Sequence, residues 1–494
     1  MAHKHRKKSR KLGSKLAPKK QQDFRRRKLY LTLTIMAVGM IIAVLWHGWQ
    51  GWGLGNKYPY NSFLFIEDLR FTDLSDPIKA SLLPSPYLEK FSDYFPFTYV
   101  CLWWFSGMNP WVTPYFFLGF ISLGLGGALM YALRPVIPKW WACLLCAIGL
   151  FAFSYPFLFC LDRGNLEIAL ALLVSISLLF FQKRYWFLGL ACLLPAICFK
   201  FYPILLLALF IRRRHLTKAI LVGVVFLVIS VCSMASFYYT LSENWQLWHR
   251  NLDYFKLHYV IANWGFSGSA SPWNTCKALL VTAYSLVYPS YDADLTTIRV
   301  DLLNAAYTTY VIAALSTVLA VTFYAILIER DFFRRVILLL LVATMTAPSG
   351  GDYKLLFANI ALVVLILIPT KRPFDLWATG LLAFVMIPKK EIFLDYLGRT
   401  DAGFHDISIA ILLNPPCMLM AMGLLIRDGL RLSTWKHVQR RFWGILKPSL
   451  WRSRTAVNLA ARPIPVVMRR PRPKRNGVWP VQQIAPIKRT CPHV

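Results

Sequence analysis

The chain has 494 residues, of which 57% are hydrophobic, and carries a formal net charge of +33. Soluble domains are usually about 45–50% apolar, and this chain holds about a dozen apolar runs, each roughly 14–24 residues long, which can cross a bilayer as helices. The runs do not alternate between polar and apolar residues, which excludes an outer-membrane barrel. The sequence therefore predicts an all-α polytopic membrane protein, a bundle of about 11–12 transmembrane helices.

Most of the positive charge lies at the two ends of the chain. Residues 1–28 contribute +12 and residues 427–494 contribute +15, whereas residues 29–426 are nearly balanced. Such tails are typical of cytoplasmic ends that face anionic lipid head groups, so we expect both termini in the cytoplasm. The second tail is rich in Pro and Arg and is expected to be largely disordered. Nucleic-acid binding is the alternative interpretation, but membrane topology alone accounts for the charge, and no nucleic-acid partner is expected.

In chain order, the transmembrane domain is expected over residues 29–426. Leu29–Trp46 reads as a signal-anchor helix, followed by a large extracytoplasmic first loop, 47–110. Within this loop, Tyr94–Phe105 is too short to span comfortably and is expected to be interfacial or re-entrant. A second extracytoplasmic loop is expected over 240–304. The remaining predicted spans are Trp111–Leu133, Trp141–Cys160, Leu166–Phe181, Lys218–Tyr239, Ala305–Ile328, Val336–Ala347, Leu355–Pro369, Phe374–Pro388 and Ile407–Ile426.

The apolar stretch Trp186–Ile211 has basic residues at both ends, so both ends are expected on the cytoplasmic side. Lys200 and Pro203 interrupt its middle, and a proline removes a backbone donor. We therefore predict a hairpin of two short helices that breaks near Lys200, the alternative being one tilted, kinked helix. With this topology the short connections on the cytoplasmic side are basic, and nearly all acidic residues between 29 and 426 lie on the extracytoplasmic side.

A polar cluster, Asp162 to Glu167, separates two apolar runs. Polar side chains this close to a bilayer are costly unless they pair or line an aqueous cavity, so they indicate a functional site. The alternative is an ordinary solvated loop. With the predicted topology, this turn, the first loop, the break at Lys200 and the turn Pro348–Lys354 all emerge on the extracytoplasmic face. Four such elements on one face suggest one shared site.

The first loop contains the acids that could act as a general base, Asp73 and Asp76. A carboxylate beside the membrane can take the proton of an acceptor hydroxyl in the transition state. Arg163 and Lys200 supply the complement, because cations in a partly dry site stabilise the charge that develops on a leaving phosphate. For Lys200 the alternative is snorkelling to the interface.

Asn165 and Glu167 are candidates to orient Arg163 or to bind sugar hydroxyls. The turn around Asp352 and Lys354 contains paired glycines, which let the backbone approach a ligand closely, although it could also be a plain interhelical turn. No metal-ligand spacing or nucleotide-binding motif is evident, so no cofactor is predicted, and the need for a divalent metal stays open.

The motif Arg163-Gly164-Asn165-Leu166-Glu167, followed some 35 residues later by Phe199-Lys200-Phe201-Tyr202-Pro203, resembles the multi-spanning GT-C glycosyltransferases. The nearest groups are the bacterial polyprenol-phosphate-mannose-dependent mannosyltransferases and the catalytic subunit of the first GPI mannosyltransferase. The resemblance covers roughly residues 60–370 and implies a polyprenyl-phosphate-sugar donor used on the extracytoplasmic or lumenal face.

The resemblance also implies roles for residues of this chain. It places the catalytic base best at Asp73. However, this chain has Glu67-Asp68 and Asp73-x-x-Asp76 where the GPI enzyme has Asp-x-Asp, so Asp68 and Asp76 stay open as alternatives. The expected donor phosphate ligands are Arg163, Lys200 and Lys354, and the expected substrate-binding residues are Asn165, Glu167, Tyr202 and Asp352.

The sequence thus predicts a GT-C-like hexosyltransferase that moves a hexose, such as mannose, from a polyprenyl-phosphate donor to a lipid or glycan acceptor by inverting displacement. The expected location is a bacterial inner membrane, with the endoplasmic reticulum as the alternative. A transporter or flippase of lipid-linked saccharides is the rival function, and it would need no essential acid outside. A scaffold that binds lipid carriers without turnover is a third possibility. The sugar, the acceptor and the linkage stay open.

Overall fold

The chain divides into two units, Met1–Leu446 and Lys447–Val494, and the described residues all belong to the first. The computed structural model describes only part of the first unit. The two ends of the chain, with Glu67, Asp68 and residues 262–268 of the second predicted extracytoplasmic loop, lie outside the described residues, so the expectations for them stay predictions. The described residues are 18–58, 60–64, 70–89, 93–109, 112–211, 216–261, 269–287, 295–348, 351–389, 393–394 and 407–432.

Helices make up almost all of the described structure, which confirms the predicted all-α class. The first half of the unit contains α2 (Pro18–Gly48), η1 (Trp49–Gly53), α3 (Thr72–Ala80), η3 (Pro86–Leu88), α4 (Pro96–Trp103), α5 (Thr113–Leu133), α6 (Trp140–Ala152), α7 (Tyr155–Arg163), α8 (Glu167–Gln182), α9 (Trp186–Phe199) and η4 (Tyr202–Phe210). The second half contains α10 (Leu216–Ala235), α11 (Leu241–Phe255), η5 (Lys256–Ile261), α12 (Pro272–Val287), α13 (Leu295–Leu327), α14 (Phe332–Thr346), η7 (Asp352–Lys354), α15 (Leu355–Leu367), α16 (Asp375–Val385) and α17 (Ile409–Leu432).

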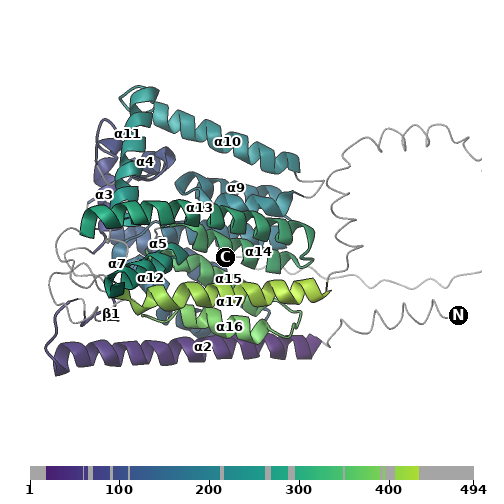
Figure 1. The fold of residues 1–494 in the computed structure, drawn as a ribbon. Coiled ribbons are helices and arrows are strands. Elements are labelled where there is room, and N and C mark those ends of the chain that lie inside the picture. The colour runs from purple at the N-terminus through teal and green to yellow at the C-terminus, as the bar shows by residue number, and fades with distance from the viewer. Residues whose placement is uncertain are drawn as a thin grey trace, which may run out of the picture. The chain divides into compact units, whose positions relative to one another are not determined.

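One small antiparallel pair joins β1 (Phe393–Leu394) to β2 (Ile407–Ser408), with Phe393 opposite Ser408. Figure 1 shows α2 along one edge of the bundle and α10 along the opposite edge. It also shows α3, α7 and α11 at one end of the bundle, which we call the site end. The opposite end, where α2 and α14 begin and α17 finishes, is called the distal end.

Five described helices are long and apolar enough to span a membrane: α2 with its extension, α5, α10, the main part of α13, and α17. A bent pair, α6 and α7, makes a sixth. The protein is therefore a polytopic membrane protein. The predicted number of about 11–12 spans is not reached on these criteria, because several apolar runs form helices of only 11–16 residues, among them α8, α9 and α16.

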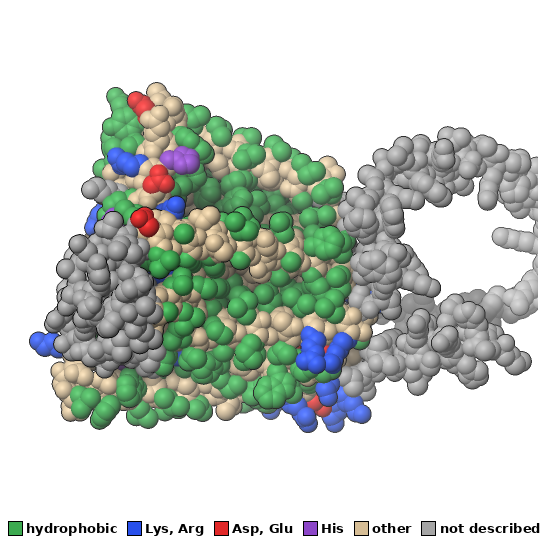
Figure 2. Space-filling model, in the orientation of Figure 1, with side chains coloured by type: hydrophobic (Ala, Val, Ile, Leu, Met, Phe, Trp, Pro, Cys, Tyr) green, Lys and Arg blue, Asp and Glu red, His purple; other side chains and the backbone are tan. Residues whose placement is uncertain are grey.

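The centre of the bundle is formed by α14 and α15, which are buried on nearly every side. A helix that is apolar all round is one that lies inside a bundle or a membrane. By contrast, α5, α10 and α13 expose large apolar side chains such as Leu123, Leu227 and Leu319. Figure 2 shows hydrophobic side chains over the middle of one face and charged ones toward its two ends, the pattern expected of a surface that lipid covers.

The predicted span Trp141–Cys160 is wrong in one respect, because it is not a single helix. It breaks into α6 and α7, which are bent by 68°. Pro156 lies in the first turn of α7, where its missing N–H costs nothing but prevents the preceding helix from continuing. The bend brings the end of α7 to the site end.

The predicted hairpin at Trp186–Ile211 is confirmed. Lys200 has extended backbone angles, φ −147° and ψ 139°, and ends α9 before the 3-10 helix η4 begins. The far ends of the two segments meet, since the rings of Trp186 and Phe210 are 5.7 Å apart between centroids. The break therefore carries Lys200 at the tip of a hairpin, on the site end.

The distal end is held by buried ion pairs, which we call the distal ion cluster. Arg334 of α14 pairs with Asp375 of α16 at 2.6 Å, and both side chains are fully buried. Arg372 donates to both oxygens of Glu329, at 2.8 and 2.9 Å. Lys28 of α2 is also buried and donates to the carbonyl of Ile368, at 3.1 Å, just beyond the end of α15. A cation at a helix C-terminus is favourable there.

Candidate active site

The turn between α7 and α8 is built around Gly164. This residue ends α7 with φ +68°, the left-handed conformation that glycine adopts without strain. The side-chain carbonyl of Asn165 then accepts a hydrogen bond from the N–H of Glu167, at 3.0 Å, and α8 begins. Glu167 thus lies in the first turn of a helix, where the helix dipole favours a negative charge.

The first loop packs directly against this turn. Phe71 also has a positive φ, 62°, and its N–H donates to the carbonyl of Asp162 at 3.0 Å. A Cβ placed on Gly164 would lie only 3.1 Å from the Cα of Phe71. Arg70 adds an ion pair to Asp162, at 3.4 Å. Glycine is therefore required at position 164 for two reasons, its backbone conformation and the close approach of the loop.

This packing carries Asp73 to the turn. Asp73 lies in the first turn of α3, immediately after Phe71 and Thr72. One carboxylate oxygen pairs with Arg163, and the other accepts a hydrogen bond from Asn165 at 2.6 Å. The side chains of Asp73 and Arg163 retain 16% and 17% exposure, so a substrate can still reach them.

A second set of contacts surrounds Glu167, whose side chain is fully buried. Lys200 donates to one of its oxygens at 2.9 Å, and the hydroxyl of Tyr202 donates to the other. Lys200 itself is 18% exposed. Because Asn165 contacts both Asp73 and the backbone of Glu167, the two sets form one connected network. We call Asp73, Arg163, Asn165, Glu167, Lys200 and Tyr202 the site network.

Two tyrosines flank the ammonium of Lys200. The ring of Tyr94 lies 4.9 Å from it and the ring of Tyr353 lies 5.5 Å away, measured to the ring centroids. Aromatic faces attract a cation, and more strongly when water is partly excluded. Tyr94 comes from the first loop and Tyr353 from η7, so the fourth predicted element also reaches the network.

Lys354 follows Tyr353 and is half-buried. Burial, together with the positive charge of Lys200, lowers the pKa of Lys354 to about 8, against the attraction of Glu167 and Asp93. Burial also raises the pKa of Asp93, although Lys200 and Lys354 oppose the shift. The charges of Lys200, Lys354 and Asp93 therefore influence one another.

Two predicted residues lie away from the network. Asp76 is largely exposed, and its described side-chain contacts are two long ones of 3.5 Å, with Ser75 and Lys79 of the same helix. Asp352 is buried and accepts a hydrogen bond from the N–H of Ala270 at 3.0 Å, so it ties η7 to the segment before α12. Of the proposed acids in the described part of the first loop, only Asp73 contacts Arg163 or Lys200 among the contacts that the structure describes.

Asp93, Tyr94 and Tyr353 were not predicted as site residues. Tyr94 begins the segment that was expected at the membrane interface, and Tyr353 lies between Asp352 and Lys354, which were predicted. Tyr259 of η5 is a further neighbour, because the charges of Asp73 and Arg163 act on its hydroxyl. Aromatic residues are too frequent in this chain for the sequence to mark the three tyrosines.

The network can support displacement at a phosphate-bearing carbon. It holds a partly exposed carboxylate beside two cations, in a site where buried neighbours limit water. Cations and carboxylates placed so act more strongly on developing charge than they would in water. Within the described residues there is no group of three or more His, Cys, Asp or Glu side chains that could hold a metal ion.

Comparison with known proteins places the chain in a family. The model of glycosyltransferase family 87 matches residues 91–348, which is more than half of the chain and includes Arg163, Glu167 and Lys200; Asp73 lies before the matched segment. No curated protein and no solved structure gives a significant match. The chain belongs to glycosyltransferase family 87 and is a membrane glycosyltransferase.

Proposed function

We propose that this protein transfers a hexose, such as mannose, from a polyprenyl-phosphate donor to a lipid or glycan acceptor. The observation that carries the proposal is the site network itself. Asp73, Arg163 and Lys200 come from three segments far apart in the sequence and meet at one end of the bundle. A base and two cations at the end of a membrane bundle suit a donor whose phosphate lies at the lipid boundary.

In the proposed reaction, the acceptor hydroxyl attacks the anomeric carbon of the donor sugar. The new bond forms between the acceptor oxygen and this carbon, while the bond from this carbon to the phosphate oxygen breaks. Asp73 takes the hydroxyl proton, and the polyprenyl phosphate leaves with the electron pair. One displacement of this kind inverts the anomeric centre.

In the unliganded structure each cation already has a partner, because Arg163 pairs with Asp73 and Lys200 with Glu167. The donor phosphate would share these cations rather than replace their partners. Arg163 has five N–H donors, and Lys200 has three, so both can bind a second oxygen. Lys354 would add a further positive charge, and Asn165, Glu167 and Tyr202 would hold the two cations or bind sugar hydroxyls.

The topology belongs to the same proposal. The site end would face the extracytoplasmic side and the distal end the cytoplasm, with both termini cytoplasmic and the basic tails on anionic lipid head groups. A GT-C-like bundle in a bacterial inner membrane fits this arrangement. The short, positively charged connections at the distal end, among them Arg134, Lys183 and Arg330, support this orientation.

The experiment compares Asp73→Asn with Asp76→Asn in purified protein supplied with labelled polyprenyl-phosphate mannose and a membrane lipid extract. Asp76 is a matched control, because it is also a carboxylate of α3 but is exposed and outside the network. We expect Asp73→Asn to lower transfer by about 10²–10⁴-fold while donor binding is kept, and Asp76→Asn to remain near wild type.

The opposite pattern, loss in Asp76→Asn alone, would overturn the assignment of Asp73. Transport of the labelled lipid across a vesicle membrane without transfer would instead favour the flippase function. Labelled glucose donor run in parallel tests whether mannose is the sugar.

A further inference from the structure

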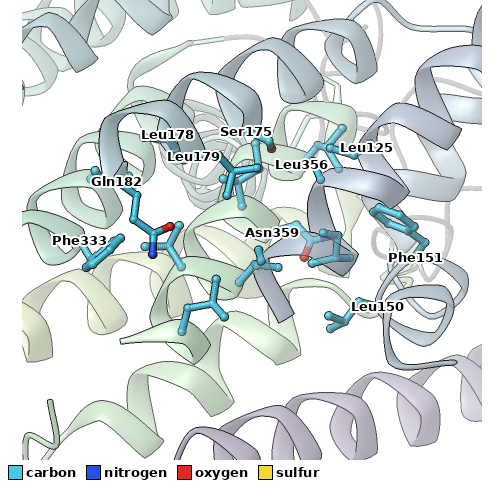
Figure 3. Close-up of a pocket in the computed structure, with 18 of the residues that line it drawn as sticks. Leu125, Leu150, Phe151, Ser175, Leu178, Leu179, Gln182, Phe333, Leu356 and Asn359 are labelled. Atoms are coloured by element: carbon cyan, nitrogen blue, oxygen red, sulfur yellow. The ribbon is translucent and has the colours of Figure 1, made fainter. Parts of the chain in front are cut away.

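A pocket in the interior of the bundle plays no part in the reaction proposed above. Its walls come from α5, α6, α8, α14 and α15 and are almost entirely apolar. Figure 3 shows its elongated form, with Gln182 and Phe333 toward one end and Leu150 and Phe151 toward the other. Such a shape suits a chain rather than a compact ligand.

The pocket opens at the distal end of the bundle. Gln182 there is exposed and Phe333 is half-buried, whereas at the opposite end Leu150 and Leu356 are buried and Phe151 is half-buried, so the most exposed lining residue lies at the distal end. Along α15 the lining runs from Leu356 to Leu367, which is about 16 Å at the helical rise of 1.5 Å per residue. That length is about half of the 30 Å hydrocarbon core of a bilayer, the depth of one leaflet.

Exposed cations stand next to the mouth. Lys183 and Arg184 follow the lining residue Gln182, and Arg134 lies two residues beyond Ala132, another lining residue. The ammonium of Lys183 lies 4.6 Å from the ring centroid of Tyr131, which places the ends of α5 and α8 side by side.

A third element completes the rim. The rings of Trp186 and Phe332 are 6.3 Å apart between centroids, so the start of α14 adjoins the turn after α8. Exposed Arg330 lies two residues before this start. The nearby acids are already engaged, because Glu329 binds Arg372 and the carboxylate of Asp331 caps α14. The rim therefore presents positive charge to its surroundings.

We propose that this pocket binds one anionic phospholipid of the leaflet at the distal end. One acyl chain lies between α5, α8, α14 and α15, and the phosphate rests on Arg134 and Lys183 at the mouth. The polyprenyl chain of the donor is a different occupant, and its phosphate belongs to the site end, where Arg163 and Lys200 lie. The lipid that occupies the pocket must instead place its charged head group at the distal end.

The test is native mass spectrometry of the full-length protein in detergent, titrated separately with phosphatidylglycerol and phosphatidylcholine of equal chain length. We expect wild type to retain phosphatidylglycerol at least about tenfold more strongly, since each surface cation favours an anionic lipid. Arg134→Gln combined with Lys183→Gln should bring the two lipids to near equality. The matched control, Arg427→Gln with Arg431→Gln, removes two cations from the end of α17 and should keep the preference.

A second pair of variants tests the acyl chain. Ala128→Phe fills the pocket and should reduce retention of phosphatidylglycerol severalfold. Gly127→Phe, the neighbouring residue of α5, adds the same ring where a new Cβ would meet nothing within 4 Å and should have no effect. Equal retention of both lipids by wild type, or an effect of Gly127→Phe equal to that of Ala128→Phe, would overturn the proposal. Displacement of bound phosphatidylglycerol by polyprenyl phosphate, lost in Ala128→Phe, would assign the pocket to the donor chain instead.

Discussion

The two ends of the bundle hold ion pairs made of the same residue types but arranged differently. In the distal ion cluster, Arg334 and Asp375 are both completely buried. In the site network, Arg163, Asp73 and Lys200 each retain 16–18% exposure. Glu167 and Asn165 are buried, and Glu167 pairs with Lys200. The site network also receives residues from three separate segments, whereas both distal pairs link the start of α14, or the residues just before it, to the start of α16, or the residues just before it.

The difference separates an ion pair that fastens helices from one that can meet a substrate. A fully buried pair matters for stability mainly when one partner is removed, because the remaining charge is then buried without a partner, which is costly. A partly exposed pair contributes less to stability, but its atoms remain available to a ligand. Loss of a distal charge should therefore lower stability, and loss of a site charge should lower transfer.

The largest expected effect is at the distal end. Asp375→Asn leaves Arg334 buried without its anion and should lower the free energy of unfolding by about 3–5 kcal/mol. Adding Arg334→Met removes the lone charge and should recover most of that loss. Thermal unfolding in detergent measures both, and sugar transfer per folded molecule should stay at the wild-type value. A specific loss of transfer by the stable double variant would contradict the purely structural role.

The next effect concerns Lys200 and Glu167, which combine both roles. Lys200→Met leaves the buried carboxylate of Glu167 with only Tyr202 and should lower stability and transfer together. Adding Glu167→Gln removes the lone charge and should restore the unfolding temperature, but transfer should remain at least about 100-fold reduced. Recovery of transfer in the double variant would show that Lys200 serves the fold and not the donor.

A smaller effect is expected at the turn. Gly164→Ala forces a side chain into the left-handed region and against Phe71, at a cost of about 1–2 kcal/mol. Because Phe71 and Asp73 are close in sequence, Asp73 should shift, and transfer should fall about tenfold or more. Gly119→Ala, on α5 where a new Cβ meets nothing within 4 Å, is the control. Equal transfer by Gly164→Ala and Gly119→Ala would show that the conformation of the turn does not affect catalysis.

The smallest effect is a pH dependence of donor binding. The pKa of Lys354 is lowered to about 8, so its ammonium is charged at pH 7 and neutral at pH 9. The KM for the donor should therefore rise severalfold between these values, since the phosphodiester keeps its charge throughout. In Lys354→Arg the guanidinium stays charged, and this rise should disappear. If the KM still rises in Lys354→Arg, the rise comes from the titration of another group.

Much of the fold follows from local sequence patterns. Apolar runs of the right length predicted the spanning helices, since only helices satisfy backbone groups in lipid. The break at Lys200 followed from a charge and a proline within one apolar stretch. The bend at Ser154-Tyr155-Pro156 was missed because the apolar run continues through it, and hydrophobicity alone does not record how a backbone turns. Short helices such as α16 were predicted as spans for the same reason.

The sequence predicted separate parts of the candidate site. Chain topology placed the turn at Arg163, the first loop and the break at Lys200 on one face, because the parity of the spans decides on which side each connection emerges. The choice of Asp73 over Asp76 needed a resemblance, and the structure adds a geometric difference between them. Residues such as Tyr94 and Tyr353 carry no mark in the sequence.

The sequence by itself determined the class of protein, the apolar runs that form its helices and the residues able to carry charge near the membrane, because these depend on composition and on local hydrophobicity. The tertiary structure alone decided which charges meet. Arg163 pairs with Asp73, 90 residues away, and Lys28 reaches the end of α15, 340 residues away. Such contacts depend on how helices pack and on where a glycine allows two segments to approach closely. Neither can be predicted from the local sequence of one segment.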